Sequence, residues 1–278
     1  MNSSLPLNAP VDMVMPPTAQ LWMNVLNWGL AVVLLGFALD YWRRRGSTVG
    51  VWLLLGGALT TLNEPIVDVL GKCWFPAFGA WVAFKAWGFS TPLYMIAVYS
   101  WYVGGQAFLS YRRFRTGITR RGVFQLFGTF AAVNMLLEIP GLNTAIPMYS
   151  YYGHQPFVFL GFPIWWMFCN GMMPLVIAAV VLKGDALLQG VRRPLIVPLV
   201  WMSACMTNAL IAPPTWLALN LEGGTPLLTH AAAVVSLGMS LMVCYAVASV
   251  VAIDPPESPF GANEPRHEQN GRLAAGVP

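Results

Sequence analysis

Two carboxylic acids stand four residues apart near the end of a long apolar stretch of the sequence. Glu64 and Asp68 belong to Asn-Glu-Pro-Ile-Val-Asp-Val-Leu, which closes an apolar run that begins at Val49. In a helix, residues four apart share one face, so both acids would point in the same direction. An ionisable side chain inside a membrane costs about 2.5 kcal/mol or more, which makes it a candidate for function. Pro65 removes a backbone donor, which weakens the local backbone hydrogen bonding and often leaves a kink.

A second pair with the same spacing closes another apolar run, where Asn134 precedes Glu138 by one helical turn. Carboxylic acids that share surroundings of low dielectric constant do not all ionise together, so one of them can keep its proton. A neutral acid beside a carboxylate or an imidazole is an acid–base pair. Such a pair could protonate a hydroxyl, carbonyl or epoxide and accept a proton elsewhere. We therefore predict Glu64, Asp68 and Glu138 as catalytic residues.

Further polar and aromatic residues are expected at the same depth of the chain or in the connections above it. Any one amide or imidazole in a helix bundle is more often a hydrogen bond between helices than part of a site. Their occurrence together at one level favours a site that binds a substrate. The residues predicted to bind substrate are Asn63, Trp74, Asn134, His154, Asn170, Asn208 and His230.

The composition places the chain in a membrane. Hydrophobic residues make up 57% of the chain and charged residues only 9%, whereas soluble domains carry about 25% charged residues. Residues 1–20 hold no Lys or Arg and no small-residue cleavage pattern, so no removable signal is expected. The net charge of +4 comes from short basic clusters between apolar runs, which is typical of loops and does not indicate nucleic-acid binding.

Seven apolar segments have about the length that crosses a bilayer, roughly 20 residues. They cover residues 21–41, 49–70, 91–111, 122–138, 157–182, 194–219 and 227–251, and the sixth is interrupted by prolines. The expected fold is an all-α integral membrane bundle of seven transmembrane helices. We divide the chain into an extracytoplasmic segment (1–19), the helical domain (20–252) and a polar, proline-rich cytoplasmic tail (253–278) that we expect to be disordered.

The basic residues predict how the helices are oriented, because loops rich in Lys and Arg stay in the cytoplasm. Clusters follow the first, third, fifth and seventh segments, whereas the opposite side receives only Lys72 and Lys85. The N-terminus is therefore predicted outside and the C-terminus in the cytoplasm of a cell-membrane protein. This orientation places Glu64, Asp68 and Glu138 toward the outer surface.

Two connections on the outer side are rich in aromatic residues. We expect residues 71–90 to fold back as a re-entrant or interfacial helix, and residues 139–156 to form a second lid. Aromatic belts at the headgroup level explain such residues without a ligand. A vestibule for a lipid-like ligand is the more specific interpretation.

Several chemistries lack the residues that they require. The seventh segment has no Lys for a retinal Schiff base, and three His are too few for a histidine-rich di-iron site. Cys73, Cys169, Cys205 and Cys244 are far apart and are expected to be unpaired packing residues. Nucleotide-binding, serine-hydrolase and zinc-protease motifs are absent. We therefore expect no metal and no cofactor.

The segment Asn-Glu-Pro-Ile-Val-Asp-Val-Leu-Gly, the Trp74-Phe75-Pro76 turn, the Tyr149–Pro156 segment and the Trp165-Trp166 pair together resemble the spirocyclase AveC-like family of actinobacterial integral membrane proteins. The resemblance covers most of the chain, from the first to the seventh segment. It implies an activity like that of a spirocyclase or dehydratase on a polyketide or another lipid. No catalytic residue is transferred from the family to this sequence.

These observations leave three functions open. The leading hypothesis is a membrane-embedded acid–base enzyme that cyclises, spiroketalises or dehydrates a lipophilic polyketide, terpenoid or lipid, with Glu64 as the proton donor. An integral-membrane terpene cyclase would also use buried acids, to open an epoxide. A non-catalytic lipid binder, carrier or assembly subunit would use the same polar layer to hold a headgroup. The expected partners are a lipophilic small molecule and membrane lipids, and no nucleic acid.

Overall fold

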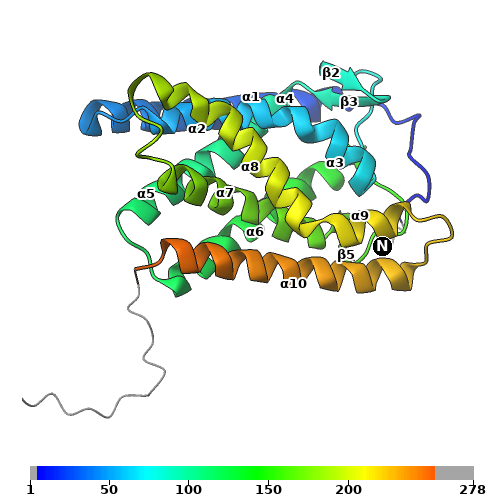
Figure 1. Ribbon diagram of the computed structural model, residues 1–278. Helices are drawn as coiled ribbons and strands as arrows, with labels where there is room; N and C mark the ends of the chain where they lie inside the picture. The colour runs from blue at the N-terminus through cyan, green and yellow to red at the C-terminus, as the bar shows by residue number, and fades with distance from the viewer. Residues whose placement is uncertain (1–4, 254–278) are drawn as a thin grey trace, which may run out of the picture.

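The computed structural model describes residues 5–253, which form a bundle of long helices with short hairpins at one end (Figure 1). The predicted cytoplasmic tail lies outside these residues, apart from its first position. The helices are α1 (Pro17–Arg45), α2 (Val49–Thr60), α3 (Glu64–Gly71), α4 (Tyr94–Val98), α5 (Gln106–Arg115), α6 (Arg120–Leu142), α7 (Trp165–Lys183), α8 (Ile196–Ile211), α9 (Pro213–Asn220) and α10 (Pro226–Val251). Two 3₁₀ turns, η1 (Thr61–Asn63) and η3 (Gly190–Leu195), join neighbouring helices, and a π-helix, η2 (Tyr99–Gly105), joins α4 to α5.

Six helices in the described part of the chain are long and apolar enough to cross a membrane. They are Pro17–Arg45, Val49–Gly71, Arg120–Leu142, Trp165–Lys183, Gly190–Ile211 and Pro226–Val251. The predicted segment 91–111 is also helical, because α4, η2 and α5 follow one another without a break. It is not one of the six, and its sequence includes Tyr99, Ser100 and Gln106, which lower its apolar character.

Two predicted segments have boundaries that differ from the expected ones. Helix α7 begins at Trp165 rather than at 157, because residues 158–163 form the hairpin β5 (Val158–Phe159) and β6 (Phe162–Pro163). The sixth segment does not continue as one helix to 219. Helix α8 ends at Ile211, and Pro213 starts α9, since two successive prolines cannot donate the hydrogen bonds that α8 would need.

The expected re-entrant helix over residues 71–90 is wrong. This segment contains β1 (Cys73–Trp74) and the hairpin of β2 (Val82–Ala86) with β3 (Phe89–Pro92). Its loop is Trp87-Gly88, and both residues have positive φ, 50° and 82°. A two-residue loop of this kind matches the twist of antiparallel strands, so the local turn prevails over the aromatic composition.

The two predicted lids are joined to each other by a short antiparallel ladder. Strand β1 pairs with β4 (Ser150–Tyr151), so that Cys73 lies opposite Tyr151 and Trp74 opposite Ser150. The hairpins β2–β3 and β5–β6 lie at one end of the bundle, on the right in Figure 1. Strand β1 follows directly after α3, which also ends there. We call this the hairpin end.

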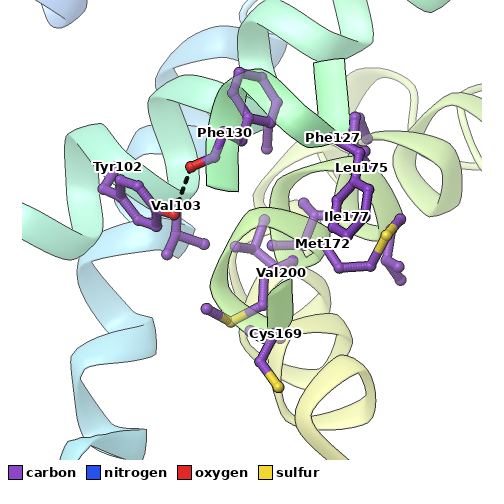
Figure 2. Packing of buried hydrophobic residues seen from close by; sticks show 14 of the residues in the cluster. Tyr102, Val103, Phe127, Phe130, Cys169, Met172, Leu175, Ile177 and Val200 are labelled. Atoms are coloured by element: carbon purple, nitrogen blue, oxygen red, sulfur yellow. Dashed lines mark hydrogen bonds between the residues drawn. The ribbon is translucent and has the colours of Figure 1, made fainter. Parts of the chain in front are cut away.

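Helix α7 lies at the centre of the bundle and packs against α5, α6, α8 and α10. Its sequence is apolar all round, as expected of a helix surrounded by others. Figure 2 shows Cys169 and Met172 of α7 among the side chains of neighbouring helices, with the Tyr102 hydroxyl directed at the Phe130 carbonyl of α6. That hydrogen bond is 3.4 Å long and ties the π-helix to α6.

The π-helix packs directly on α2 through glycines. A β-carbon on Gly57 would lie 2.6 Å from the carbonyl oxygen of Tyr99, and one on Gly104 would collide with the backbone of Leu53. Because neither glycine carries a side chain, the two backbones approach closely, as small residues allow in membrane bundles. This contact sets the position of Tyr99 relative to α2 and α3.

Candidate functional site

One cavity at the hairpin end collects most of the predicted acids and amides. It holds about 90 Å³ of free space, which is room for several water molecules or a slender part of a ligand. Its walls come from α1, α3, α4, η2, α6, α7 and the segments that carry β1 and β4. The lining residues are Met23, Glu64, Val67, Asp68, Cys73, Phe75, Tyr94, Met95, Val98, Tyr99, Tyr102, Val103, Asn134, Leu137, Glu138, Tyr149, Tyr151, Trp166, Asn170 and Met173.

Glu64 lies at the start of α3 and is only 4% exposed. The 3₁₀ turn over Thr61–Asn63 precedes it, and Pro65 occupies the first turn of α3, where its missing N–H leaves no helical bond unmade. The hydroxyl of Tyr99 donates a hydrogen bond of 2.5 Å to Oε2 of Glu64. The π-helix therefore supplies a neutral partner to this acid.

Asp68 follows one turn later on the same face and is 2% exposed. Its Oδ2 atom is buried and has no hydrogen-bond partner among the described residues. Cys73 lies beside Asp68, and burial, with the nearby negative charge of Asp68, raises the pKa of the Cys73 thiol well above its ordinary value. Cys73 is therefore a neutral thiol and not a nucleophilic thiolate.

Glu138 sits in a much richer set of donors. Tyr149 donates to its Oε2 at 2.7 Å, Tyr151 donates to the same oxygen at 3.3 Å, and Asn134 donates to Oε1 at 3.3 Å. Tyr149 also donates to the Glu138 carbonyl oxygen at 2.9 Å. Three side-chain donors lower the cost of a negative charge on this carboxyl group.

The two tyrosines remain donors over the ordinary pH range. Burial, followed by the negative charge of Glu138, raises the pKa of Tyr149 and of Tyr151 well above that of a free tyrosine. Tyr151 reaches the cavity because β4 pairs with β1, and Tyr149 stacks on Phe75 with ring centroids 4.9 Å apart. The junction of the two lids thus forms one wall of the cavity.

The amides extend this network into the centre of the bundle. Asn170 of α7 donates to Oδ1 of Asn134 at 3.3 Å, and Asn134 in turn donates to Glu138. The order Asn170, Asn134, Glu138 therefore forms a directed chain of hydrogen bonds that ends on a carboxylate.

Two further buried atoms of the lining have no partner among the described residues: the Tyr94 hydroxyl and Nε1 of Trp166. Together with Oδ2 of Asp68 they provide two donors and one acceptor in the cavity wall. Buried polar groups are nearly always hydrogen-bonded. A molecule with polar groups of its own therefore fits this cavity better than a purely apolar one.

Two of the predicted binding residues lie between helices instead. Oδ1 of Asn63 accepts hydrogen bonds from Trp201 at 2.6 Å and from Cys205 at 3.1 Å, which ties α8 to the end of α2. Asn208 is buried in α8 and does not line the cavity. Asn63 therefore serves the contact with α8, and neither Asn63 nor Asn208 belongs to the cavity lining.

Three more predicted binding residues lie outside the cavity lining. His230 accepts from the Phe157 backbone at 3.4 Å, and its Nδ1 lies 2.6 Å from the Pro226 carbonyl oxygen, so it fastens the β5 segment to α10. His154 is exposed. The Trp74 ring packs edge-on against Phe89 at 5.2 Å between centroids. His230 was predicted from its depth, and His154 and Trp74 from their place in the outer connections; neither criterion determines which way a side chain points.

Five tyrosines of the cavity lining were not among the predicted site residues: Tyr94, Tyr99, Tyr102, Tyr149 and Tyr151. Tyrosine near the end of an apolar run is typical of the membrane interface. Because that explanation needs no ligand, these tyrosines were not predicted as site residues. One signal was present: Tyr149 and Tyr151 are two residues apart, as side chains on one face of a strand would be.

The cavity contains acids without bases. Among the described residues, no Lys, Arg or His belongs to its lining, and no group of three or more His, Cys, Asp and Glu could hold a metal ion. The charge of three carboxyl groups is therefore moderated only by neutral donors, by protons or by a ligand. An arrangement of this kind can give and accept protons and can stabilise a positive charge.

No family model matches this chain, and neither does any curated protein or any solved structure.

Proposed function

We propose that this protein is a membrane-embedded acid–base enzyme that cyclises or dehydrates a lipophilic molecule, with spiroketal formation as the leading reaction. One observation carries the proposal: Glu64, Asp68 and Glu138 line one cavity with aromatic walls, to which residues 5–253 contribute no basic side chain. The resemblance to the spirocyclase AveC-like family points to the same chemistry and belongs to the proposal. The seven-span topology, the outward N-terminus and the location in the cell membrane are also parts of the proposal.

The proposed roles follow from the hydrogen bonds of the three acids. Glu138 accepts three side-chain donors and is the carboxylate that takes up a proton. Glu64 and Asp68, one turn apart and both buried, keep at least one proton between them because two adjacent charges are costly there. Glu64 is the proton donor, and Tyr99 orients it. Asp68, with its free oxygen, positions the substrate hydroxyl.

The reaction is balanced in protons. In a ketalisation, Glu64 protonates a hemiketal hydroxyl, water leaves, and a second hydroxyl of the substrate attacks the resulting oxocarbenium ion. Glu138 accepts the proton that this hydroxyl releases. In a dehydration, water leaves in the same way and Glu138 removes a proton from the neighbouring carbon. The aromatic residues Tyr94, Tyr102 and Trp166 belong to the wall, and aromatic rings can stabilise a positively charged intermediate.

The test is metabolite profiling of a deletion strain complemented with variants. Glu64→Gln keeps the size of the side chain and its amide oxygen can still accept from Tyr99, but it has no proton to transfer. We expect the Glu64→Gln strain to match the deletion strain, with product lost and a hydroxylated precursor accumulated. Glu222→Gln, the same chemical change at an exposed position in the turn between α9 and α10, should match the wild type.

The same strains distinguish the alternatives. A terpene cyclase would lose a cyclic terpenoid rather than an oxygen heterocycle. A lipid binder or carrier would yield no missing product, and purified Glu64→Gln protein would lose its bound lipophilic molecule. An unchanged profile in the deletion strain would refute the enzymatic proposal.

A further inference from the structure

A large basic hollow lies at the opposite end of the bundle from the cavity. It measures about 790 Å³ and is formed by the last turns of α1, the α1–α2 connection and the end of α5. Both helices end on the left in Figure 1, away from the hairpins. We call this the arginine pocket, and its lining residues are Phe37, Asp40, Tyr41, Arg44, Arg45, Ser47, Arg112, Arg115 and Thr116.

Two of its four arginines are already engaged with acids. Arg44 pairs with Asp40 at 2.9 Å, and Arg115 lies 3.6 Å from Asp185 and donates to the Tyr111 hydroxyl at 2.9 Å. Among residues 5–253, Arg45 and Arg112 have no carboxylate partner. The pocket therefore carries excess positive charge on two side chains that are open to a ligand.

Arg112 is also held in place. Its guanidinium group lies over the rings of Tyr41 and Phe108, at 5.4 and 5.7 Å from their centroids. Stacking of this kind fixes the plane of the guanidinium group and leaves its N–H groups free to donate. A planar, oriented guanidinium group is well suited to bidentate contact with a phosphate.

A buried polar atom provides an independent sign of a ligand. The Ser47 hydroxyl lies in the same lining, is buried, and has no hydrogen-bond partner among the described residues. Arginines at helix ends are common because they balance the helix dipole. That explanation accounts for neither the hollow between the two helices nor the unpaired hydroxyl at its edge.

The membrane side of the pocket is apolar. Phe37 belongs to the lining and is 58% exposed, and Val33 on the turn before it is 54% exposed. A ligand with its anionic group on Arg45 and Arg112 would thus lay an apolar part along α1. We propose that the arginine pocket binds an anionic phospholipid, with the phosphate on Arg45, Arg112 and Ser47 and an acyl chain along Phe37.

The test is native mass spectrometry of the detergent-purified chain with equal amounts of phosphatidylglycerol and phosphatidylcholine. We expect the anionic lipid to be retained preferentially. Arg45→Gln/Arg112→Gln should weaken its binding by about tenfold or more, since each arginine near a membrane surface contributes substantially to the attraction of anionic lipid. The control is Arg43→Gln/Arg113→Gln, which removes the same charge from exposed positions on the same helices outside the pocket.

Several outcomes would overturn the proposal. These are equal retention of both lipids, an equal loss in the two double variants, and displacement of the lipid by glycerol 3-phosphate at the same concentration. The last result would show a site for soluble phosphate instead of lipid. If the double variant does not fold, Arg45→Gln alone decides, because it leaves the Arg112 ring contacts intact. Catalytic activity enters none of these measurements, so the result is independent of the proposed enzyme.

Discussion

At the hairpin end of the bundle, three carboxyl groups are enclosed among tyrosines and amides, and the strands cover them. At the opposite end, which carries the arginine pocket and which we call the arginine end, charged side chains are mostly exposed. Arg44 pairs there with Asp40, and Arg115 and Arg193 pair with Asp185. The arginine end thus uses ordinary ion pairs, whereas within residues 5–253 the hydrogen bonds to the cavity acids come from neutral groups. Acids kept apart from bases cost stability, and function is the usual reason for such a cost.

The largest effect is expected where α2 meets the π-helix. Gly57→Leu would force α2 away from Tyr99, since even a β-carbon at Gly57 lies 2.6 Å from the Tyr99 carbonyl oxygen. We expect a loss of about 3 kcal/mol or more from overpacking, seen as a large fall in the thermal unfolding temperature. Gly29→Leu on α1, where no atom lies within 4 Å of the added β-carbon, is the control. Equal effects would contradict the close packing.

The next largest effect on stability is expected to differ between two acids of the hairpin end, Glu138 and Asp68. Glu138→Ala leaves three side-chain donors without their acceptor and should cost on the order of 3 kcal/mol. Asp68→Asn should leave stability unchanged or raise it, because Oδ2 of Asp68 has no hydrogen-bond partner to lose in the part of the chain that the structure describes. Chemical unfolding in detergent measures both. A large loss for Asp68→Asn would show that Asp68 has a structural role.

A smaller effect concerns the cover of the hairpin end. Gly88 has a φ of +82° and open space around it, so Gly88→Val adds backbone strain without a clash. The expected cost is about 1–2 kcal/mol, confined to β2 and β3. Hydrogen exchange should accelerate over residues 82–92 and nowhere else. Gly238→Val on α10, also in open space but with helical backbone, should change little.

The smallest effect is expected at the arginine end. Arg193 donates to Asp185 at 2.9 Å and to Gln189 at 2.8 Å, and its side chain is 12% exposed. Arg193→Ala should cost about 1 kcal/mol and less at high salt. Arg44→Ala, at a pair in which Arg44 is 77% exposed, should be close to neutral. If Arg193→Ala cost as much as Glu138→Ala, the contrast between the two ends would be lost.

The helices could be predicted from the sequence because long apolar runs leave few other structures in a membrane. That Glu64, Asp68, Asn134, Glu138 and Asn170 meet was also predictable, and the structure brings these five residues to one cavity. Their catalytic and binding roles stay predictions.

The direction of each side chain was not predictable in the same way. Asn63 and His230 were predicted at the same depth as the acids and yet turn to other partners, because the rotation of a helix depends on tertiary packing. The hairpin over 82–92 depends on the conformation of Trp87-Gly88, which the surrounding aromatic residues obscured. Tyr99 reaches Glu64 through a π-helix, for which the sequence shows no local pattern.

That π-helix also links the two ends of the molecule. A π turn holds more residues than an α turn, so the helix after it is rotated compared with an uninterrupted α-helix. Each residue of an α-helix advances the chain by about 100° around its axis, given 3.6 residues per turn. Removing one residue between Tyr99 and Gly105 would therefore restore regular winding and swing Arg112 and Arg115 to another side of α5. The rotation of this helix about its axis therefore determines both which side chain faces Glu64 and which arginines face α1.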